Sequence, residues 1–365
     1  MTFYQKLIRP ILFRLSPDHV HDFTVNIGSL LGKNAFSREL LSVFFNFEDQ
    51  KLNTKVFGIK FKNPIGIAGG FDKNAKLIQT LPSIGFGFIE VGSITAKPYK
   101  GNRKPWNVRL PKDKSIIVNY GLKNEGVEVL RKRIKRQKRT TPLIINIAKT
   151  NDIRIKGEAS TEDYNKSFIK LQSLADIINL NVSCPNTGDG TLFCESPEML
   201  NKLLARISKN KILKPVVLKL KPDITDSILE EIVKIATGYP FIKGFIISNL
   251  TSNRKLLKKT KAKETRQYNG GISGKPMYKL SNEMIRKVYK KTNGNYAIIG
   301  LGGVFTAEDA YEKICLGASL VEIATGLIYG GPSTVKNINK GLVKLLERDG
   351  FNNISQAIGS KNKLS

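Results

Sequence analysis

The segment Ile177–Asn186, IINLNVSCPN, gives the clearest indication of the fold. Its first six residues form a largely apolar run, which is the pattern of a parallel β-strand that is covered on both faces. The run then gives way to Ser183, Cys184, Pro185 and Asn186, so the strand is expected to end in polar groups and a thiol. In parallel α/β proteins ligands bind at the carboxyl ends of the strands. The stretch therefore predicts a buried strand with a site at its end.

Seven further segments after residue 50 show a similar apolar strand pattern. Short β-rich segments alternate with amphipathic helical segments, and an apparent hairpin, VFGIKFKNP, precedes the first of them. Eight such units predict an α/β fold, a (β/α)8 TIM barrel. A doubly wound open sheet is the alternative, but no G-x-G-x-x-G motif follows the first strand. The eight predicted strands are Ile65–Ala68, Phe86–Val91, Leu143–Ile147, Ile177–Val182, Val216–Leu220, Gly244–Ser248, Tyr296–Gly300 and Ser319–Ala324.

An N-terminal helical extension precedes the barrel. Apolar residues recur at helical spacing over residues 3–15 and 20–31, so two amphipathic helices are expected. Pro10 predicts a kink, and Ser16 is a candidate N-cap. The extension is either a helical hairpin packed on the body or an apolar lid that lies in a membrane interface. The predicted domains are the extension at 1–45, the barrel at 46–345 and a polar C-terminal tail at 346–365.

The chain carries an unusually large positive charge for its length. The chain has 365 residues, an apolar share of 41%, which is enough for a large core, and a formal net charge of +30. Such a charge indicates either a polyanionic partner or lysine-rich solvated helix faces. The densest basic run, RKRIKRQKR at 131–139, lacks the interleaved aromatics of a single-strand binding platform. We therefore expect no nucleic-acid partner but a general attraction to anionic membrane surfaces.

Cysteine and histidine usage limits the chemistry. The three cysteines, Cys184, Cys194 and Cys315, show no paired spacing, which argues against a disulfide framework and against zinc. We expect no metal site. The only histidines, His19 and His21, lie near the N-terminus, so proton transfer in the barrel is expected to use other groups. No signal peptide is recognisable, and no run reaches the roughly 20 apolar residues of a membrane span.

Amide groups are expected to gather at the strand ends. Each asparagine offers a donor and an acceptor, which suits a flat heterocycle with alternating C=O and N–H groups, and a lysine would face a carboxylate on it. One asparagine comes from an irregular segment before the third strand. For any single asparagine a turn or a cap is the alternative explanation. The expected group is Asn119, Asn181, Asn186, Asn249 and Lys73.

Cys184 is the candidate general base of this site. A free thiol has a pKa of about 8.5, which nearby cations can lower; the alternative is a small buried hydrophobe. Lys219, at the end of the fifth strand, could stabilise a reduced, anionic flavin, or it could be a lysine that snorkels to solvent. Glycine-rich turns after the last two strands could hold a phosphate on backbone N–H groups, with plain turn chemistry as the alternative; these turns are Gly302, Gly303, Thr325 and Gly326, with Gly274 adding an amide.

The chain resembles the dihydroorotate dehydrogenase family, FMN-dependent barrel enzymes of pyrimidine synthesis. The resemblance covers nearly the whole chain, and its motifs occur in the order of the family: NPIGIAGGFDKNA, VGSITAKPYKGNRKPWNVRLP, NYGLKN, NVSCPNT, KLKPDIT, GGISGKP, IIGLGGV and LGASLVEIATGLIYGGP. The extension YQKLIRPILFRLSPDHVHDFTV resembles that of the membrane-associated, quinone-reducing class 2, in which it forms the quinone tunnel.

The resemblance implies a role for each matching position. Cys184 would take the proton from C5 of dihydroorotate while the flavin takes the hydride from C6, and His21 and Arg109 would lie near the quinone. The implied FMN-binding residues are Gly69, Gly70, Lys73, Ser93, Asn146, Asn181, Lys219, Ser248, Gly274, Gly303, Ala324 and Thr325. The implied substrate-binding residues are Lys73, Asn119, Tyr120, Gly121, Leu122, Asn181, Asn186, Asn249 and Leu250.

Three departures from the class 2 pattern bear on these roles. Cys184 stands where class 2 usually has serine, Ala324 replaces a tyrosine that is often beside flavin and quinone, and Leu250 replaces a threonine. Since a thiol is more acidic than a hydroxyl, we expect the rate to hold up to lower pH.

The function implied is oxidation of dihydroorotate to orotate in UMP synthesis, with a membrane quinone as acceptor. A class 1-like enzyme that uses fumarate or another soluble acceptor is the alternative. A more distant alternative is a non-enzymatic basic barrel that binds RNA or an anionic surface. We expect a monomer, held peripherally at the cytoplasmic face of the cell membrane.

Overall fold

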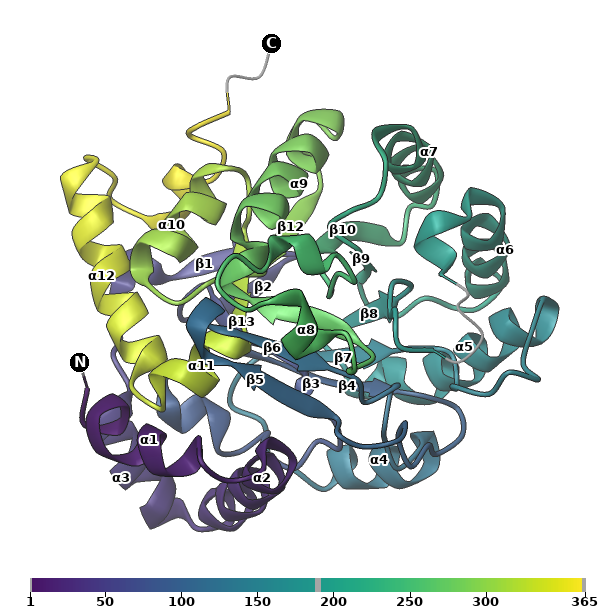
Figure 1. Cartoon of the computed structure of the whole chain (residues 1–365). Coiled ribbons are helices and arrows are strands. Elements are labelled where there is room, and N and C mark those ends of the chain that lie inside the picture. Colours follow the sequence, from purple (N-terminus) through teal and green to yellow (C-terminus); the bar gives the residue numbers. More distant parts are fainter. Residues whose placement is uncertain (1, 188–191, 363–365) are drawn as a thin grey trace.

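A closed barrel of eight parallel strands forms the centre of the computed structural model, which describes residues 2–187 and 192–362 (Figure 1). Around the barrel the strands follow the order β10-β12-β13-β3-β4-β7-β8-β9, and β9 closes on β10. All eight predicted strands and the barrel are confirmed, with shifts at the strand ends. The observed bounds are β3 Ile65–Asp72, β4 Phe88–Ile94, β7 Leu143–Ile147, β8 Ile177–Asn181, β9 Val216–Leu220, β10 Ile242–Ile247, β12 Ala297–Leu301 and β13 Leu320–Ile323.

Helices cover the outside of the barrel, and each turns an apolar stripe towards the strands. The fully apolar strands are explained by this arrangement, because the helices shield one face and the barrel interior the other. The predicted hairpin is also confirmed: β1 (Thr54–Val56) and β2 (Ile59–Phe61) pair antiparallel, and Val56 and Phe61 pack against the start of the barrel interior. The covering helices are α4 Val127–Lys135, α5 Glu158–Leu171, α6 Pro197–Ser208, α7 Asp226–Thr237, α9 Tyr278–Lys291, α10 Ala307–Cys315 and α12 Thr334–Arg348; the short α11, Thr325–Gly330, follows β13 at the barrel mouth and contacts β11.

The barrel interior is built in two layers with opposite polarity. The lower layer is apolar and includes Phe88, Ile144, Ile177, Val217 and Leu320. Since side chains two residues apart share one face of a strand, the next inward positions form a second layer nearer the mouth. That upper layer is polar and completely or almost completely buried, and its members are Glu90, Asn146, Asn179, Lys219 and Glu322.

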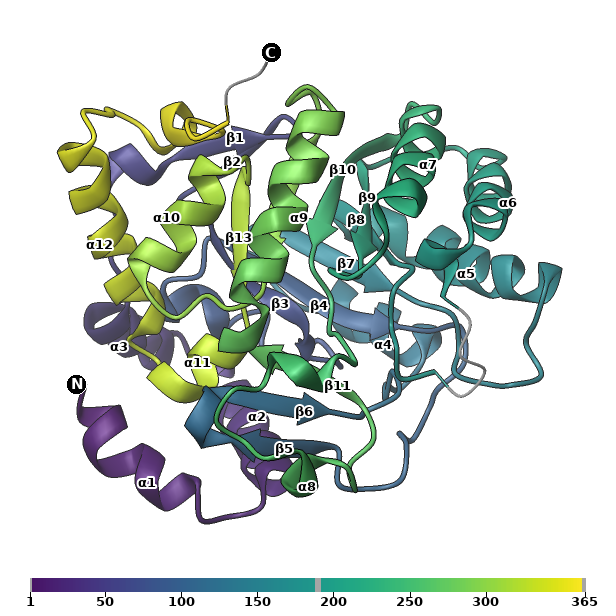
Figure 2. The ribbon, with the colours of Figure 1, turned by 45° about the horizontal axis from the view of Figure 1, so that its top comes forward.

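A second, three-stranded antiparallel sheet lies across the barrel mouth (Figure 2). It consists of β5 (Asn107–Leu110), β6 (Ser115–Val118) and β11 (Gly271–Gly274), with β6 in the middle and the short α8 (Ala262–Thr265) in the loop before β11. The predicted irregular segment before the third barrel strand, residues 118–124, begins at the last residue of β6 and is otherwise not in a strand or helix, but the sheet itself was not predicted. These strands are short, and β11 joins β6 from about 150 residues further along the chain, so no local pattern announces the pairing.

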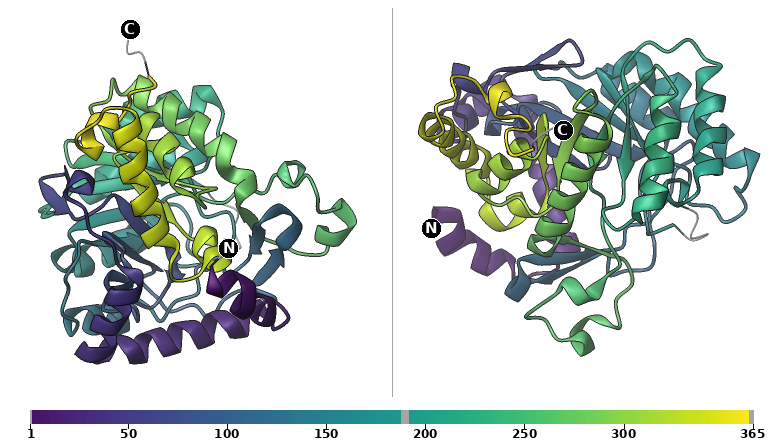
Figure 3. Two further views of the ribbon diagram at one scale, coloured as in Figure 1. Left: turned by 90° about the vertical axis from the view of Figure 1, so that its left-hand side faces the viewer. Right: turned by 90° about the horizontal axis from the view of Figure 1, so that it is seen from above.

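The N-terminal extension is helical as predicted, but it has more parts (Figure 3). The first segment is a π-helical turn, Tyr4–Ile8, which continues directly into α1, Arg9–Leu12; the backbone stays helical at Ile8 and Arg9, and Pro10, which has no N–H to donate, lies where the hydrogen-bond pattern changes. The next helix, α2, begins after Ser16 as predicted, although the Ser16 side chain makes no cap hydrogen bond, and it runs over Pro17–Lys33. A third helix, α3 (Ala35–Phe45), was not separately predicted.

The C-terminal segment packs on the barrel and is not a free polar tail. The predicted boundary at residue 346 lies within α12, which ends at Arg348. Beyond it Ile354 and Ala357 are buried, the backbone N–H of Lys361 donates to Cys315 O at 2.9 Å, and Asn362 Nδ2 donates to Leu316 O at 2.6 Å. The last three positions of the predicted tail lie outside the described residues.

Candidate active site

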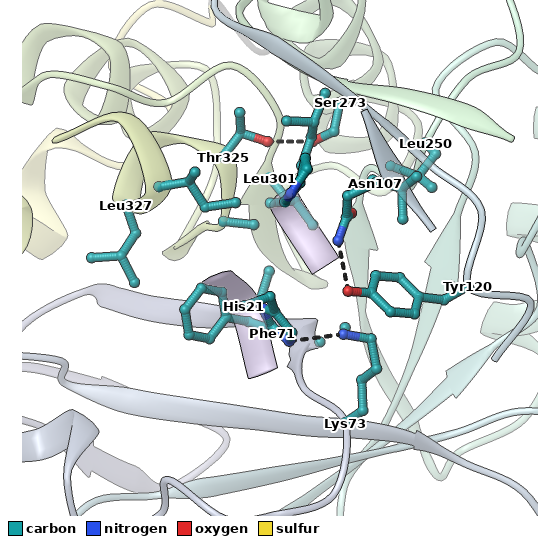
Figure 4. Close-up of a pocket in the computed structure, with 18 of the residues that line it drawn as sticks. His21, Phe71, Lys73, Asn107, Tyr120, Leu250, Ser273, Leu301, Thr325 and Leu327 are labelled. Atoms are coloured by element: carbon teal, nitrogen blue, oxygen red, sulfur yellow. Dashed lines mark hydrogen bonds between the residues drawn. The ribbon is translucent and has the colours of Figure 1, made fainter. Parts of the chain in front are cut away.

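A cavity of about 460 Å³ lies at the carboxyl ends of the barrel strands, where the fold predicts a site. Its walls come from three parts of the molecule: the strand ends, the β5–β6–β11 sheet and helix α2 (Figure 4). Most of the predicted site residues line it. These are Gly69, Gly70, Lys73, Ser93, Asn146, Asn181, Lys219, Ser248, Ala324 and Thr325 from the cofactor set, Tyr120, Gly121, Leu122, Asn186, Asn249 and Leu250 from the substrate set, and Cys184, His21 and Arg109.

Lys219 forms the charged floor of the cavity. Its side chain is only 3% exposed, so it does not snorkel to solvent. Nζ lies 2.9 Å from Glu90 Oε2 and 3.8 Å from Glu322 Oε2. Burial opposes the charge of Lys219, but the two carboxyl groups outweigh it and raise the lysine pKa. An ammonium ion is therefore held at the bottom of the cavity.

Glu90 and Glu322 were missed by the sequence analysis. Each is a single acidic residue inside an apolar strand, FIEVGSI in β4 and LVEI in β13. An isolated carboxyl group in such a run must find a partner in the barrel interior, since burying an unpaired charge is costly. That pattern was the available signal, and it predicts a buried cation nearby.

Three of the four predicted asparagines converge on one side of the cavity. Asn181 Nδ2 donates to Ser93 Oγ at 3.0 Å, and Asn249 Nδ2 donates to Asn181 Oδ1 at 3.1 Å. Asn186 anchors itself on the neighbouring sheet, where its Nδ2 donates to Val118 O at 2.8 Å. The amide groups are thus fixed by one another and by the backbone before any ligand arrives.

Asn119 differs from the other three asparagines because it is not part of the cavity wall formed by the described residues. Its Oδ1 accepts a hydrogen bond from Asn102 Nδ2 at 3.0 Å, and the same Nδ2 donates to Asn186 O at 3.2 Å. Asn119 therefore lies behind the wall and supports Asn186 through Asn102. Asn107, on β5, lines the cavity in its place and donates to Tyr120 Oη at 2.6 Å (Figure 4). Asn107 was missed because β5 was not recognised.

Lys73 and His21 meet at the side of the cavity where α2 passes (Figure 4). Lys73 Nζ donates to His21 Nε2 at 3.1 Å and lies 3.6 Å from the centre of the Tyr120 ring. Burial, together with the charge of Lys123, lowers the Lys73 pKa to about 7. Burial and Lys73 lower the His21 pKa well below its usual value, so His21 is neutral. The barrel itself contributes no histidine to the cavity wall, and His21 reaches the cavity from α2 of the extension.

Cys184 follows β8 and lines the cavity beside the asparagines, as predicted. The charge of Lys219 does act to lower the pKa of this thiol, but it does not decide the outcome. Burial raises the pKa of this thiol to about 11, and neither the backbone hydrogen bond from Asn186 nor the charge of Lys219 compensates for it. The other two cysteines are buried in the core, where burial also raises their pKa values.

Of the predicted phosphate-turn residues, Gly302 and Thr325 line the cavity, while Gly326 follows Thr325 and lies outside the described wall. Gly302 and Ser273 line the cavity, whereas Gly303 and Gly274 lie next to them, outside the described wall. Both of the latter need glycine for structural reasons: each has a positive φ, and a Cβ on Gly303 would lie 2.6 Å from Tyr278 Cα. Thr325, at the start of α11, shares a hydrogen bond of 2.8 Å with Ser273 (Figure 4).

Arg109 joins the β5–β6 hairpin to the extension. Its Nη1 donates to Leu12 O at 3.1 Å and to Leu15 O at 2.9 Å, and its guanidinium lies 4.6 Å from the Phe13 ring centre. Asp18 makes a second connection, because its carboxylate accepts the backbone N–H groups of Trp106 and Asn107 at 3.0 and 2.9 Å. The extension is therefore fixed over the site by its contacts with the second sheet.

Fold and site together define a (β/α)8-barrel enzyme whose ligands bind over a buried lysine at the strand ends. The family model for dihydroorotate dehydrogenase matches residues 51–346. The chain is 42% identical to the dihydroorotate dehydrogenase (quinone) of Christiangramia forsetii over 94% of this chain and 99% of that protein, and 36% identical to that of Trichodesmium erythraeum over the whole of both. Ligand-free DHODH from Eimeria tenella superposes with a TM-score of 0.85 at 29% identity, over 95% of this chain and 99% of the other. The chain belongs to the dihydroorotate dehydrogenase family.

Proposed function

We propose that the protein oxidises dihydroorotate to orotate in pyrimidine synthesis, with FMN as its cofactor and a membrane quinone as the acceptor. The observation that carries this proposal is the continuity of the cavity. One space is lined by the amide groups and Cys184, by the phosphate turns, and by His21 and Arg109 beside the extension. A substrate, a cofactor and an electron acceptor can therefore bind next to one another.

The residues at the floor fit FMN in three respects. Lys219 offers a buried positive charge to the flavin ring. Asn146 Oδ1 is buried and has no hydrogen-bond partner among the described residues, so it is available to accept a bond from a ligand. Gly69 allows close approach, since a Cβ there would lie 2.7 Å from the Glu90 carboxyl carbon and block the floor. Gly302, Ser273 and Thr325 would hold the phosphate. When bound, FMN accepts the hydride from the substrate.

The side chains of the protein hold the substrate and move its proton. Asn181, Asn186 and Asn249 would orient the flat ring through paired donors and acceptors. Lys73 would face the carboxylate of dihydroorotate, whose charge would bring the lysine pKa back up from about 7 and keep the ammonium form. Cys184 Sγ would accept the proton from C5. Because burial raises the pKa of this thiol to about 11, only a small fraction of it is thiolate at neutral pH, but that thiolate is a strong base.

Electrons would leave through the extension to a membrane quinone. Twelve large apolar side chains of the extension are 40–73% exposed, a concentration that monomeric soluble proteins avoid unless the surface is used. Among the described residues, the helices are too short or too polar to cross a bilayer. These features support a peripheral protein whose extension dips into the membrane surface at its cytoplasmic face, and we propose a monomer. The twelve residues are Phe3, Leu7, Ile8, Ile11, Leu15, Phe23, Ile27, Leu30, Phe36, Leu40, Val43 and Phe44.

The test is a steady-state assay of dihydroorotate oxidation with a panel of acceptors. The purified protein is expected to be yellow and to show the FMN spectrum, which a non-enzymatic basic barrel would not. Rapid turnover with ubiquinone or menaquinone analogues and little with fumarate is expected. Preferential use of fumarate would favour the class 1-like enzyme instead. A colourless protein that does not take up FMN would rule out both the quinone-dependent and the class 1-like enzyme.

A further inference from the structure

The two glutamates of the polar barrel layer have very different hydrogen-bond environments. Glu90 accepts four hydrogen bonds: Oε2 from Gly69 N and from Lys219 Nζ, and Oε1 from Asn146 Nδ2 and from Asn179 Nδ2. That set of donors suits an ionised carboxylate, which only accepts. The Glu90 pKa accordingly lies below its usual value, because Lys219 and the other donors outweigh the burial that would raise it.

Glu322 has no such donors. Its side chain is completely buried, and neither carboxyl oxygen has a hydrogen-bond partner among the described residues. Lys219 Nζ is 3.8 Å away, beyond hydrogen-bond distance, and is already bonded to Glu90. An ionised carboxylate in this position would leave both oxygens unsatisfied in the barrel interior, which is among the most costly arrangements a protein can hold.

We propose that Glu322 is held as a neutral carboxylic acid, that its O–H donates to the Glu90 carboxylate, and that the two glutamates together place one negative charge, not two, against Lys219. The proton gives Glu322 the donor that its environment requires. It also removes the repulsion between two carboxylates that share one cation.

The charge balance of the layer supports this assignment. The groups that face Glu322 are Glu90 from β4 and Lys219 from β9. With both glutamates ionised, the three groups carry a net charge of −1 in a buried layer; with one proton they are neutral. Burial, followed by the charge of Glu90, raises the Glu322 pKa well above its usual value, and Lys219 offsets this only in part.

The consequence for function rests on the proposed FMN. A neutral layer beneath the flavin opposes the arrival of electrons less than a layer with a charge of −1 would. Glu322 would thus be a positioning and electrostatic residue: it fixes Glu90, and through Glu90 it sets how much of the Lys219 charge is left for the cofactor.

The test is infrared difference spectroscopy of the flavin-loaded protein at pH 7, wild type minus Glu322→Gln. We expect the carbonyl band of a protonated carboxyl group, which shifts on transfer to D₂O. The matched control is Glu308→Gln, which removes an exposed glutamate whose pKa lies below its usual value because of the Thr306 hydrogen bond, and it should show carboxylate bands only. Carboxylate bands in the Glu322→Gln difference would overturn the proposal.

Two further measurements keep the test decisive. Glu322→Asp retains a carboxyl group, so it should shift the carbonyl band of the protonated carboxyl group without abolishing it. This variant replaces Glu322→Gln in the test if the glutamine variant does not fold. The midpoint potential of the flavin at pH 7 should be nearly the same in wild type and Glu322→Gln, because a neutral group replaces a neutral group, whereas a clear rise in the variant would mean that Glu322 is ionised. Both readouts are independent of the substrate, so an inactive enzyme would count against the proposed function but not against this assignment.

Discussion

The polar layer inside the barrel and the N-terminal extension both depart from the usual rule that charged side chains are exposed and apolar ones buried. The barrel buries two glutamates and a lysine at 0–3% exposure and offsets the cost with mutual pairing and asparagine donors. The extension leaves large apolar side chains exposed, such as Phe36 at 73% and Val43 at 70%. Each arrangement suits a proposed ligand: the buried charges suit a flavin, and the exposed apolar surface suits lipid and quinone. Substitutions in one region should leave the function of the other unchanged.

Reduction of the flavin by dihydroorotate should depend on Cys184 at the barrel mouth and not on the exposed apolar surface of the extension. Cys184→Ala is expected to slow flavin reduction by dihydroorotate by about 10²- to 10⁴-fold, the usual contribution of a general base. Reoxidation of the pre-reduced enzyme by a quinone should be unchanged, because the extension is intact. Stopped-flow measurement of the two half-reactions checks this, with Cys194→Ala as the matched control. Equal loss in both half-reactions would contradict the separation of the two regions.

The pH dependence of flavin reduction tests the raised Cys184 pKa of about 11. Since the thiolate is the base, the rate should rise about tenfold per pH unit from pH 7 to 9 without reaching a plateau. The Cys184→Ser profile should lie lower, because a hydroxyl is less acidic than a thiol. Superimposable profiles would show that the thiol proton does not control the rate.

The buried charge pair should matter more for stability than any surface pair. Lys219→Met leaves the ionised Glu90 without its cation, and we expect a loss of about 3–5 kcal/mol in the free energy of unfolding, together with a colourless protein. Lys287→Met, which breaks an exposed pair with Asp226, should cost about 1 kcal/mol or less. Urea unfolding and the flavin absorbance measure both effects. Similar losses in the two variants would contradict the role of the polar layer.

Lys313 is a buried lysine outside the cavity, and the effect of burial on its pKa should make the stability of the protein depend on pH. It is completely buried, and Nζ donates to Ser281 Oγ at 2.9 Å and to Asn282 Oδ1 at 2.8 Å. Burial lowers its pKa from 10.5 to about 7, so between these values the unfolded chain binds more protons than the folded one. Stability should therefore rise with pH from about 7 to about 10, by on the order of 2–4 kcal/mol.

Comparison with Lys313→Met isolates this effect. The wild-type protein should gain unfolding free energy relative to the variant as the pH rises through that window, measured by urea unfolding at pH 7, 8.5 and 10. Lys290→Met, which removes an exposed lysine of α9, serves as the control and should follow the wild-type slope. A wild-type slope equal to that of Lys313→Met would show that the lysine is not the source.

The apolar face of the extension should matter for membranes and not for chemistry. The double change Phe36→Glu and Val43→Glu is expected to weaken binding to anionic lipid vesicles by about tenfold or more, because it removes apolar surface and adds negative charge. Ile153→Glu, at an exposed apolar residue of the loop after β7, should leave binding almost unchanged. Vesicle sedimentation measures binding, and flavin reduction by dihydroorotate should be the same in all three proteins.

The barrel, and most of the residues that line its cavity, could be predicted from local sequence patterns. Each barrel strand reports its burial through its own apolar run, as in Ile177–Asn181, and a closed parallel barrel then brings the residues that follow the strands to one mouth. That is why Lys73, Asn181, Cys184 and Lys219 could be placed around one cavity from local patterns alone.

Contacts between distant segments, and the pKa values that depend on burial, could not be predicted in this way. The pairing of β11 with β6, the meeting of His21 with Lys73, and the sharing of Lys219 by Glu90 and Glu322 all join residues that no local period relates. The raised pKa of Cys184 belongs to the same group. Desolvation depends on every atom packed around a group, and those atoms come together only when the barrel closes and the extension covers its mouth.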